Sequence, residues 1–353
     1  MSADRWRDLP DLPGVITADE VIETAASIAS LQLPNGMIPW YPGGHCDPWN
    51  HVETALALDI AGLHHEAMRA YQWLAEVQRP DGSWHNYYRP DGSIEDAKLD
   101  TNVCAYVATG VYAHWLHTGD NAFVERFFPM VERALDWVLS LQTSRGEIIW
   151  ARHVDGTPWS YALLTGSSSI WHSLRCGLAL AQLVDGDGRP DWDLAAANLA
   201  AVIRDHPDAF EPKHRWSMDW YYPVLAGVLT DEAAERRLAS KWSEFVMEGL
   251  GVRCVNNEPW VTAAETAECA IAFNAAGLTE AAHDLLSWTR AHRQGDGSYC
   301  TGIVYPQGVQ FPADERSAYT SAAIILAADA ITGASTASAL FVEPIVDVVD
   351  DLD

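Results

Sequence analysis

One short sequence pattern, which marks the end of a helix-like stretch, occurs four times in the chain and constrains its fold more than any other feature. In each copy a helix-like stretch ends at a glutamine, crosses a glycine-containing turn and meets an aromatic or apolar pair. The glutamine and the turn glycine of the four copies are Gln32 and Gly36, Gln78 and Gly82, Gln142 and Gly146, and Gln294 and Gly297. Each copy precedes a second apolar helical stretch, so one supersecondary unit recurs. Recurrence of this kind predicts a repeat architecture in which neighbouring units bury a shared core.

Helical periodicity divides the chain into two alternating sets of segments. Amphipathic segments, which carry apolar residues at spacings of three and four with charges opposite, are expected on the outside. They cover residues 18–31, 64–78, 122–142, 191–205, 231–248 and 280–293. The segments between them are small and apolar on nearly every side, which is typical of helices that are buried all round. They cover residues 48–62, 101–117, 167–184, 219–229, 261–277 and 315–332.

Twelve helices that alternate between half-exposed and buried predict an all-α fold, an (α/α)6 toroid of six helical hairpins with short strand-like connections. The fourth unit departs from the repeat, because the segment 204–210 that should carry it has no glutamine. No stretch has the composition of a linker, so a single domain is expected over residues 1–340. Residues 341–353 end in an acidic run and are expected to form a C-terminal surface tail.

The composition narrows the range of partners. Acidic residues outnumber basic ones by 49 to 22, which gives a formal net charge of −27. Nucleic acid and anionic membrane surfaces both require clustered Lys and Arg, so neither is expected as a partner. Sixteen tryptophans are several times the usual share, and such rings either fill a large core or line an aromatic cavity. The expected partner is therefore a small-molecule substrate.

The N-terminal and cysteine patterns favour a cytoplasmic protein. The first residues contain no apolar run of the kind that a signal peptide requires, and no stretch approaches the roughly 20 apolar residues of a membrane-spanning helix. The six cysteines are scattered without paired spacing, which favours free buried thiols in a reducing compartment.

The N-termini of the inner helices surround one end of such a toroid, so residues from distant parts of the sequence converge there. Acids, aromatic rings and His at these positions predict a pocket for a sugar or a prenyl group, although a carboxylate at a helix N-terminus also serves as a cap. The candidate substrate-binding residues are Trp40, Trp49, His51, Trp84, Asn102, His172, Asp219, Trp220, Tyr221, Trp260, Asp314, Glu315 and Tyr319.

Three carboxylates are the candidates for catalysis. Asp100 opens an inner helix, where burial beside aromatic residues such as Trp84 would raise its pKa and suit it to donate a proton. Glu265 is the expected partner from across the ring. It lies three residues before Glu268 on one helix face, and buried like charges at that spacing raise one of the two pKa values. Glu53, near the start of the first inner helix, is the third candidate.

Two motifs that contain metal-ligand residue types are better explained without a metal. The segment 44–47 holds a His, a Cys and an Asp but lacks the paired spacing of a zinc site. The segment 185–193 is similar to a calcium loop yet lacks the bidentate glutamate at the twelfth position. No phosphate-binding loop, dinucleotide fingerprint or nucleophilic serine elbow occurs. The sequence therefore predicts neither a metal nor a cofactor.

The segment from Gln78 to Trp84, in the order Gln-x-x-Asp-Gly-Ser-Trp, resembles the repeat of terpenoid cyclase and protein prenyltransferase toroids. This resemblance implies the same fold, but the chemistry does not carry over. The Asp-x-Asp-Asp motif of class II cyclases and the Asp-Asp-x-x-Asp motif of class I synthases are missing, and no clear zinc-binding set of Asp, Cys and His is present. A single-domain class II cyclase with Asp100 as its proton donor stays an alternative.

A second resemblance is to six-hairpin glycosidases, such as the glucoamylase-like families. The residues from Leu99-Asp-Thr-Asn102 through Thr118-Gly-Asp120 to the outer helix ending at Trp137 look like the second hairpin of those enzymes. The resemblance implies a saccharide at one end of the ring and two carboxylates on either side of the scissile bond. Acids interleaved with aromatic rings are expected in a saccharide-binding site, whereas the cavity of a terpene cyclase should be more apolar.

We therefore expect a glycosidase-like hydrolase that acts on a saccharide or glycoside, with an isoprenoid as the alternative substrate. Asp100 and Glu265 are its expected catalytic carboxylates. A sugar epimerase or lyase on the same fold would need a histidine base, for which His51 and His172 are candidates. A non-catalytic binding protein would hold its carboxylates too far apart to flank one bond.

Overall fold

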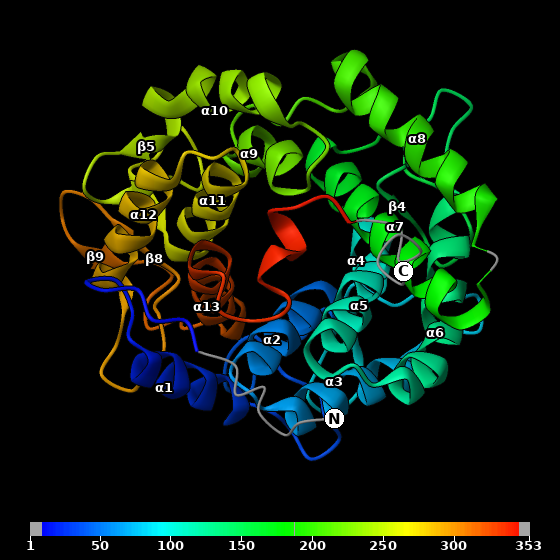
Figure 1. Ribbon diagram of the computed structural model, residues 1–353, viewed down its shortest axis with the longest axis horizontal. Coiled ribbons are helices and arrows are strands. Elements are labelled where there is room, and N and C mark those ends of the chain that lie inside the picture. The colour runs from blue at the N-terminus through cyan, green and yellow to red at the C-terminus, as the bar shows by residue number, and fades with distance from the viewer. Residues whose placement is uncertain (1–8, 187, 346–353) are drawn as a thin grey trace, which may run out of the picture.

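Six inner helical segments surround the centre of the computed structural model, which describes residues 9–186 and 188–345 (Figure 1). They are, in chain order, α2 (Pro48–Ile60), α4 with α5 (Thr101–Ala105 and Val107–Thr118), α7 (Leu164–Asp185), α9 (Met218–Leu225), α11 (Ala263–Ala275) and α13 (Ala318–Thr332). Each segment contacts the next one in this order, and α13 contacts α2, so the ring is closed. The small apolar residues that cover these helices on all sides allow neighbours to pack on both flanks.

Six outer helices cover the inner ring. They are α1 (Ala18–Ala29), α3 (His64–Val77), α6 (Asn121–Leu139), α8 (Pro190–Asp205), α10 (Asp231–Phe245) and α12 (Thr279–Trp288). Each is amphipathic: in α6, for example, Phe127, Val131 and Leu135 are buried against the ring while the charged residues face outward. The expected all-α toroid is therefore confirmed. The predicted helix 101–117 is divided at Tyr106, and the predicted helices 219–229 and 231–248 end earlier, at Leu225 and Phe245.

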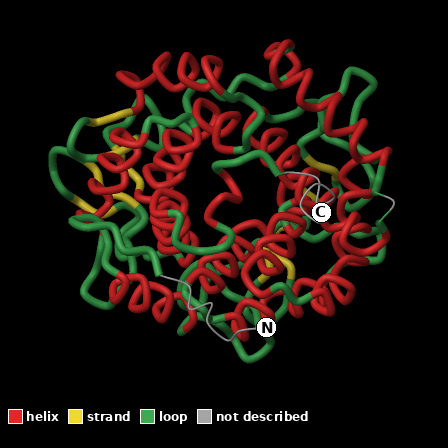
Figure 2. The backbone as a smooth tube through the Cα atoms, viewed as in Figure 1, coloured by secondary structure: helices red, strands yellow, loops and turns green. Residues whose placement is uncertain are grey.

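The strands are short and lie in the connections between helices, as Figure 2 shows. They are β1 (Tyr87–Tyr88), β2 (Ile94–Asp96), β3 (Leu99–Asp100), β4 (Ala151–Arg152), β5 (Val246–Met247), β6 (Gly251–Val252), β7 (Trp260–Thr262), β8 (Gly302–Val304) and β9 (Val309–Gln310). All pairs are antiparallel, in the orders β1-β2, β3-β4, β5-β6 and β7-β8-β9. The described residues also form three 3-10 helices, namely η1 (Pro207–Ala209), η2 (Thr289–His292) and η3 (Ser338–Phe341).

The repeated glutamine ties each turn to the outer helix of the following unit. In three copies its side-chain amide donates one hydrogen bond to the carbonyl of the turn glycine and another to a backbone carbonyl of that helix, at 2.9 to 3.1 Å. The two acceptors are Gly36 and Glu66 for Gln32, Gly82 and Met130 for Gln78, and Gly146 and Ala195 for Gln142. In the fourth copy Gln294 donates instead to the carbonyl of His292.

The turn glycines lie directly against the backbone of the same neighbouring helices. A methyl group on Gly82 would lie 2.2 Å from the carbonyl oxygen of Arg133 on α6. A methyl group on Gly297 would lie 2.8 Å from the carbonyl oxygen of Glu23 on α1, so the last copy of the repeat joins the ring to its first helix. Both glycines also have positive φ angles, of 93° and 84°, which other residues adopt only with strain. The copies of the pattern therefore share one role: each lets the turn pack directly against the backbone of a neighbouring outer helix.

The C-terminal part of the chain enters the centre of the ring, where η3 lies in Figure 1. The ring of Phe341 stacks on His172 of α7 at 4.8 Å, and Arg175 donates to the carbonyl of Ile345. Residues 341–345 therefore continue the packed structure, contrary to the expectation of a surface tail from residue 341 onward. The rest of the expected tail, 346–353, lies outside the described residues.

All six cysteines are free and buried, as the sequence predicts. Within the described part of the chain, no helix combines the length and the apolar composition that a membrane crossing requires.

Replacing Gly82 by alanine is expected to lower the free energy of unfolding by about 3 kcal/mol or more, because strain at positive φ adds to overlap with the Arg133 carbonyl. Gly92→Ala is the matched control: its φ is also positive, at 83°, but no atom lies within 4 Å of the added methyl. We expect that control to lose only about 1 kcal/mol. Urea unfolding of the two variants measures the difference, and equal losses would contradict a stabilising contact between turn and helix.

Candidate active site

Two tyrosine–carboxylate pairs from four different inner segments lie inside the ring. The hydroxyl of Tyr106, between α4 and α5, donates to Oε2 of Glu53 on α2 at 2.5 Å. The hydroxyl of Tyr221 on α9 donates to Oε2 of Glu268 on α11. All four side chains are at most 3% exposed. Helices far apart in sequence thus bring acids and phenols together in a place from which water is largely removed.

Burial favours the protonated form of both carboxyl groups. It raises the pKa of Glu53 to about 7, against the opposing hydrogen bond from Tyr106. The pKa of Glu268 is raised well above its usual range, first by burial and then by the negative charge of Glu53, while the hydrogen bonds of Tyr221 and Tyr319 oppose the shift. Oε1 of Glu268 has no hydrogen-bond partner among the residues that the structure describes.

Glu265 lies one helical turn nearer the N-terminus of α11 and is partly exposed. Its charge acts on Tyr221, Tyr319 and Glu268, because it raises the pKa of each. The expected common face of Glu265 and Glu268 is therefore observed, and the structure brings both together with Glu53. Glu265 is the most solvent-accessible acid of this group, since Glu53 and Glu268 are almost completely buried.

Asp100 lies at the position in the ring opposite to α11. The segment α4/α5 packs between α2 and α7, whereas α11 packs between α9 and α13. The carboxylate caps α4 by accepting from the backbone N–H groups of Asn102 and Val103, and Nζ of Lys98 lies 3.6 Å away. Burial raises the pKa of Asp100, while Lys98 and a hydrogen bond from the Trp150 side chain oppose that shift.

Two of the predicted tryptophans contact aromatic rings that surround these acids. The indole of Trp40 donates to Oδ2 of Asp47 at 2.6 Å. The ring of Trp49 stacks on Tyr106 at 4.6 Å and meets the edge of Tyr319 at 5.9 Å. Asn102 follows Asp100 and is half-buried, and its Oδ1 has no partner within the described chain. The structure therefore groups Trp40, Trp49, Asn102, Tyr221 and Tyr319 with the candidate acids.

Four other predicted residues do not face this group. The indoles of Trp84 and Trp220 donate to the backbone carbonyls of Leu74 and Arg237, which belong to outer helices. Both ring nitrogens of His51 contact backbone atoms, and His172 packs on η3 at the interior of the ring. The structure therefore gives His51, Trp84 and His172 no place beside these acids, whereas Trp220 lines the cavity that Asp219 also lines. Each lies in the N-terminal half of an inner helix or in the connection before it, as expected, but its side chain points toward a neighbouring element.

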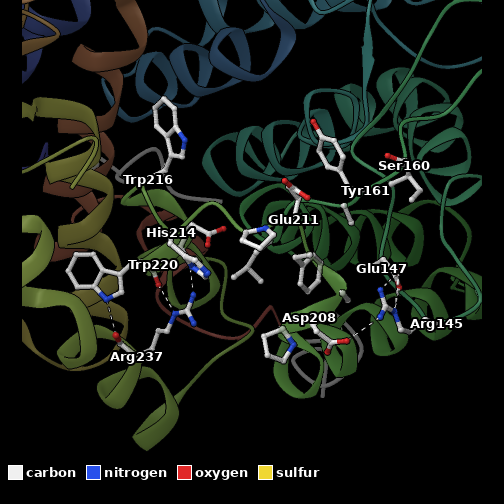
Figure 3. Close-up of a pocket in the computed structure, with 18 of the residues that line it drawn as sticks. Arg145, Glu147, Ser160, Tyr161, Asp208, Glu211, His214, Trp216, Trp220 and Arg237 are labelled. Carbon is white, nitrogen blue, oxygen red and sulfur yellow. Dashed lines mark hydrogen bonds and ion pairs between the residues drawn. The ribbon is translucent and has the colours of Figure 1, made fainter. Parts of the chain in front are cut away.

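The remaining predicted residues lie at the rim. The indole of Trp260 donates to the Phe311 carbonyl, and Glu315 accepts from the Thr301 hydroxyl. Asp314 is exposed and lines a cavity of about 660 Å³ next to α1, together with Glu315. Asp219, in the first turn of α9, lines a separate cavity of about 740 Å³ (Figure 3).

Tyr106, Lys98 and Trp150 are contacts of the candidate acids that sequence reasoning did not select. Tyr106 lies at the break between α4 and α5, so helical periodicity treats it as an ordinary buried position. Lys98 and Trp150 lie in connections, where sequence spacing does not show which side chains meet. Within residues 9–186 and 188–345, no group of three or more His, Cys, Asp or Glu side chains is arranged to hold a metal ion.

Comparison with solved structures defines the class of fold. A glycosidase in complex with glucose superposes with a TM-score of 0.72 at 16% identity, covering 90% of this chain and 97% of that one. A D-mannose isomerase superposes with a TM-score of 0.68 at 13% identity, with the same coverage. At these identities the likeness shows the fold, an (α/α)6 toroid that glycosidases share.

A relative at higher identity defines the family. The MMP endo-(1,4)-3-O-methyl-alpha-D-mannosidase of Mycolicibacterium hassiacum is 48% identical over 333 residues, which are 94% of this chain and 92% of the relative. The chain belongs to the family of this enzyme and is a glycoside hydrolase whose substrate is a saccharide. The expected glycosidase-like function is thereby confirmed in preference to the terpene cyclase. No protein-family model matches the chain.

The raised pKa of Glu53 predicts a pH dependence of stability. A carboxyl group whose folded pKa is about 7, above the ordinary 4.5, contributes stability that is fully present at acidic pH and is lost as the pH rises through 7. Between about pH 5 and about pH 8, the Glu53→Gln variant should therefore lose about 3 kcal/mol less than the wild-type protein. Urea unfolding across this range is the measurement. Parallel pH profiles for the two proteins would contradict the assignment.

Proposed function

We propose that the protein hydrolyses (1→4) bonds inside chains of 3-O-methylated α-D-mannose. One observation carries this proposal: 48% identity, nearly end to end, to an enzyme that bears this activity in its name. The aromatic rings and carboxyl groups at one end of the ring support it, because a methylated sugar presents both apolar and hydroxyl faces.

In the proposed reaction Asp100 is the general acid. Its proton passes to the glycosidic oxygen as the bond from that oxygen to the anomeric carbon breaks. Burial raises its pKa and thereby favours the protonated form that such a donor requires. Lys98 at 3.6 Å would then stabilise the carboxylate that remains after proton transfer.

Glu265 is the proposed general base. It takes a proton from a water molecule whose oxygen attacks the anomeric carbon, so that one water is added across the broken bond. Its partial exposure suits contact with water, whereas Glu53 and Glu268 are enclosed by tyrosines. Because Asp100 and Glu265 belong to opposite positions in the ring, we propose the wider carboxylate spacing and inversion at the anomeric carbon.

Glu53, expected as a third catalytic residue, is proposed to have a supporting role. Its bond to Tyr106 orients the ring on which Trp49 stacks. Through its charge it also raises the pKa of Glu268. A carboxyl group in this position acts on the substrate through the aromatic rings around it.

A histidine-based epimerase or lyase gains no support from the site. Burial lowers the pKa of both His51 and His172 to about 4. The ring nitrogens of His51 contact the backbone of Ile38 and Ala70, and Nε2 of His172 contacts the Leu340 carbonyl. A base needs a nitrogen that is free to reach the substrate.

Asp100→Asn and Glu265→Gln are expected to lower kcat on a methylmannose oligosaccharide by about a hundredfold or more, because each removes a proton-transfer group. The two variants should differ on a substrate with an activated leaving group, such as a nitrophenyl glycoside. Asp100→Asn should recover much of its rate there, since that leaving group needs no protonation, and Glu265→Gln should not. Rates by mass spectrometry, with thermal unfolding as a folding control, test the assignment.

Two outcomes would overturn parts of this proposal. Wild-type activity on both substrates retained in Asp100→Asn would exclude Asp100 as the acid. Proton NMR of the first product identifies the anomer released, and retention of configuration would exclude the proposed water-activating role of Glu265.

A further inference from the structure

The cavity of about 740 Å³ opens where the repeat is missing. Its wall contains η1 and the segment 210–216, which replace the glutamine–glycine turn that four of the six units carry. The connection from α6 to α7, the N-terminal ends of α7 and α9 and one side of α10 complete it. It therefore lies at the same end of the ring as the candidate acids, between the third and fourth hairpins.

One carboxylate on its wall has an oxygen without a hydrogen-bond partner among the described residues. Asp219 is only 9% exposed, and its Oδ1 has no donor among the described residues. The Arg237 guanidinium, its neighbour, donates to the backbone carbonyls of Asp219 and Trp220 rather than to the carboxylate. Asp219 lines the cavity, so rotation of its carboxylate would let the enclosed, unpaired oxygen accept from a ligand hydroxyl.

Two aromatic rings flank the same cavity. Figure 3 shows Trp216 on one side and Tyr161 on the other, with Glu211 and His214 between them. Trp216 is 43% exposed, which is unusual for a side chain of this size. Aromatic faces beside polar acceptors fit the two kinds of surface that a hexose presents.

The cavity is connected to Asp100 through one aromatic stack. The ring of Tyr161 lies 5.5 Å from that of Trp150 at an interplanar angle of 17°, and Trp150 bonds to Asp100. Burial raises the pKa of Tyr161, and the charges of Glu211 and Asp100 add to that shift. A chain that enters the site at Asp100 can therefore continue along Tyr161.

The basic side chains of the cavity are already engaged, which disfavours an anionic ligand. Arg145 lies 2.8 Å from Glu147 and 3.6 Å from Asp208. Lys241 lies 3.5 Å from Glu244. The unsatisfied group is an acceptor, so the ligand should supply donors, as a neutral sugar does.

We propose that this cavity is a subsite for sugar units of the substrate chain beyond those at the cleaved bond. Asp219 accepts from their hydroxyls, and Trp216 and Tyr161 contact their apolar faces. The inference rests on the proposed function, because an enzyme that cleaves within a chain must hold units on both sides of the bond.

Trp216→Ala and Asp219→Asn test this subsite through the dependence of activity on chain length. We expect the ratio of kcat/KM on a long methylmannose chain to kcat/KM on a trisaccharide to fall about tenfold in each variant, since a lost hydrogen bond or contact of this kind is worth that factor. Leu194→Ala is the control, because that side chain is 64% exposed on α8 outside the cavity. An unchanged ratio in both variants would overturn the inference.

A binding measurement separates this inference from the proposed reaction. Calorimetric titration of Glu265→Gln with the long chain avoids turnover. Adding Trp216→Ala or Asp219→Asn in that background should raise Kd about tenfold. An unchanged Kd would overturn the subsite even if the wild-type enzyme hydrolyses the chain, whereas absence of hydrolysis by wild-type protein would overturn the reaction alone.

Discussion

Direct contact between a glycine turn and the backbone of the neighbouring outer helix is the interaction on which the ring depends. The distances leave no space for a side chain: a methyl group on Gly82 would lie 2.2 Å from a carbonyl oxygen of α6. The preceding glutamine then satisfies two carbonyls at once, one in the turn and one in that helix. At Gly297 the same contact reaches α1, so the last unit is joined to the first. Closure of this kind brings inner helices from the whole sequence to a common centre.

That closure also brings acids together that would repel one another in an open structure. Glu53, Glu265 and Glu268 interact across the ring, and their burial is compensated by phenol hydroxyls, which donate to two of them. Protonation of the deeper acids removes further repulsion. The architecture thus separates one accessible carboxylate, Glu265, from two that hold the aromatic walls, and it places Asp100 on the opposite side.

The sequence predicted the twelve helices and the end of the ring where acids and aromatics gather, because hydrophobic periodicity and the repeat both report on packing. It did not predict which side of an inner helix a residue faces when that helix is apolar all round. Position along the helix therefore singles out His51 and Trp220, although both point toward an outer element, as does Trp84 in the connection before α4. Glu265 and Glu268 were placed correctly relative to each other, since spacing within one helix does define a shared face. Partners such as Tyr106 depend on contacts between helices, which spacing does not contain.

The departure from the repeat carries as much information as the repeat itself. Where the glutamine–glycine turn is present, the turn glycine packs directly against the backbone of the next helix. Between α8 and α9 that turn is replaced by η1 and a longer polar connection, and a cavity opens there. A unit that does not close tightly costs packing, and in this ring it is also the unit that presents an exposed tryptophan and an unpaired carboxylate oxygen. Structural regularity thus holds the acids in place, while the irregular unit provides the surface on which one substrate chain can be distinguished from another.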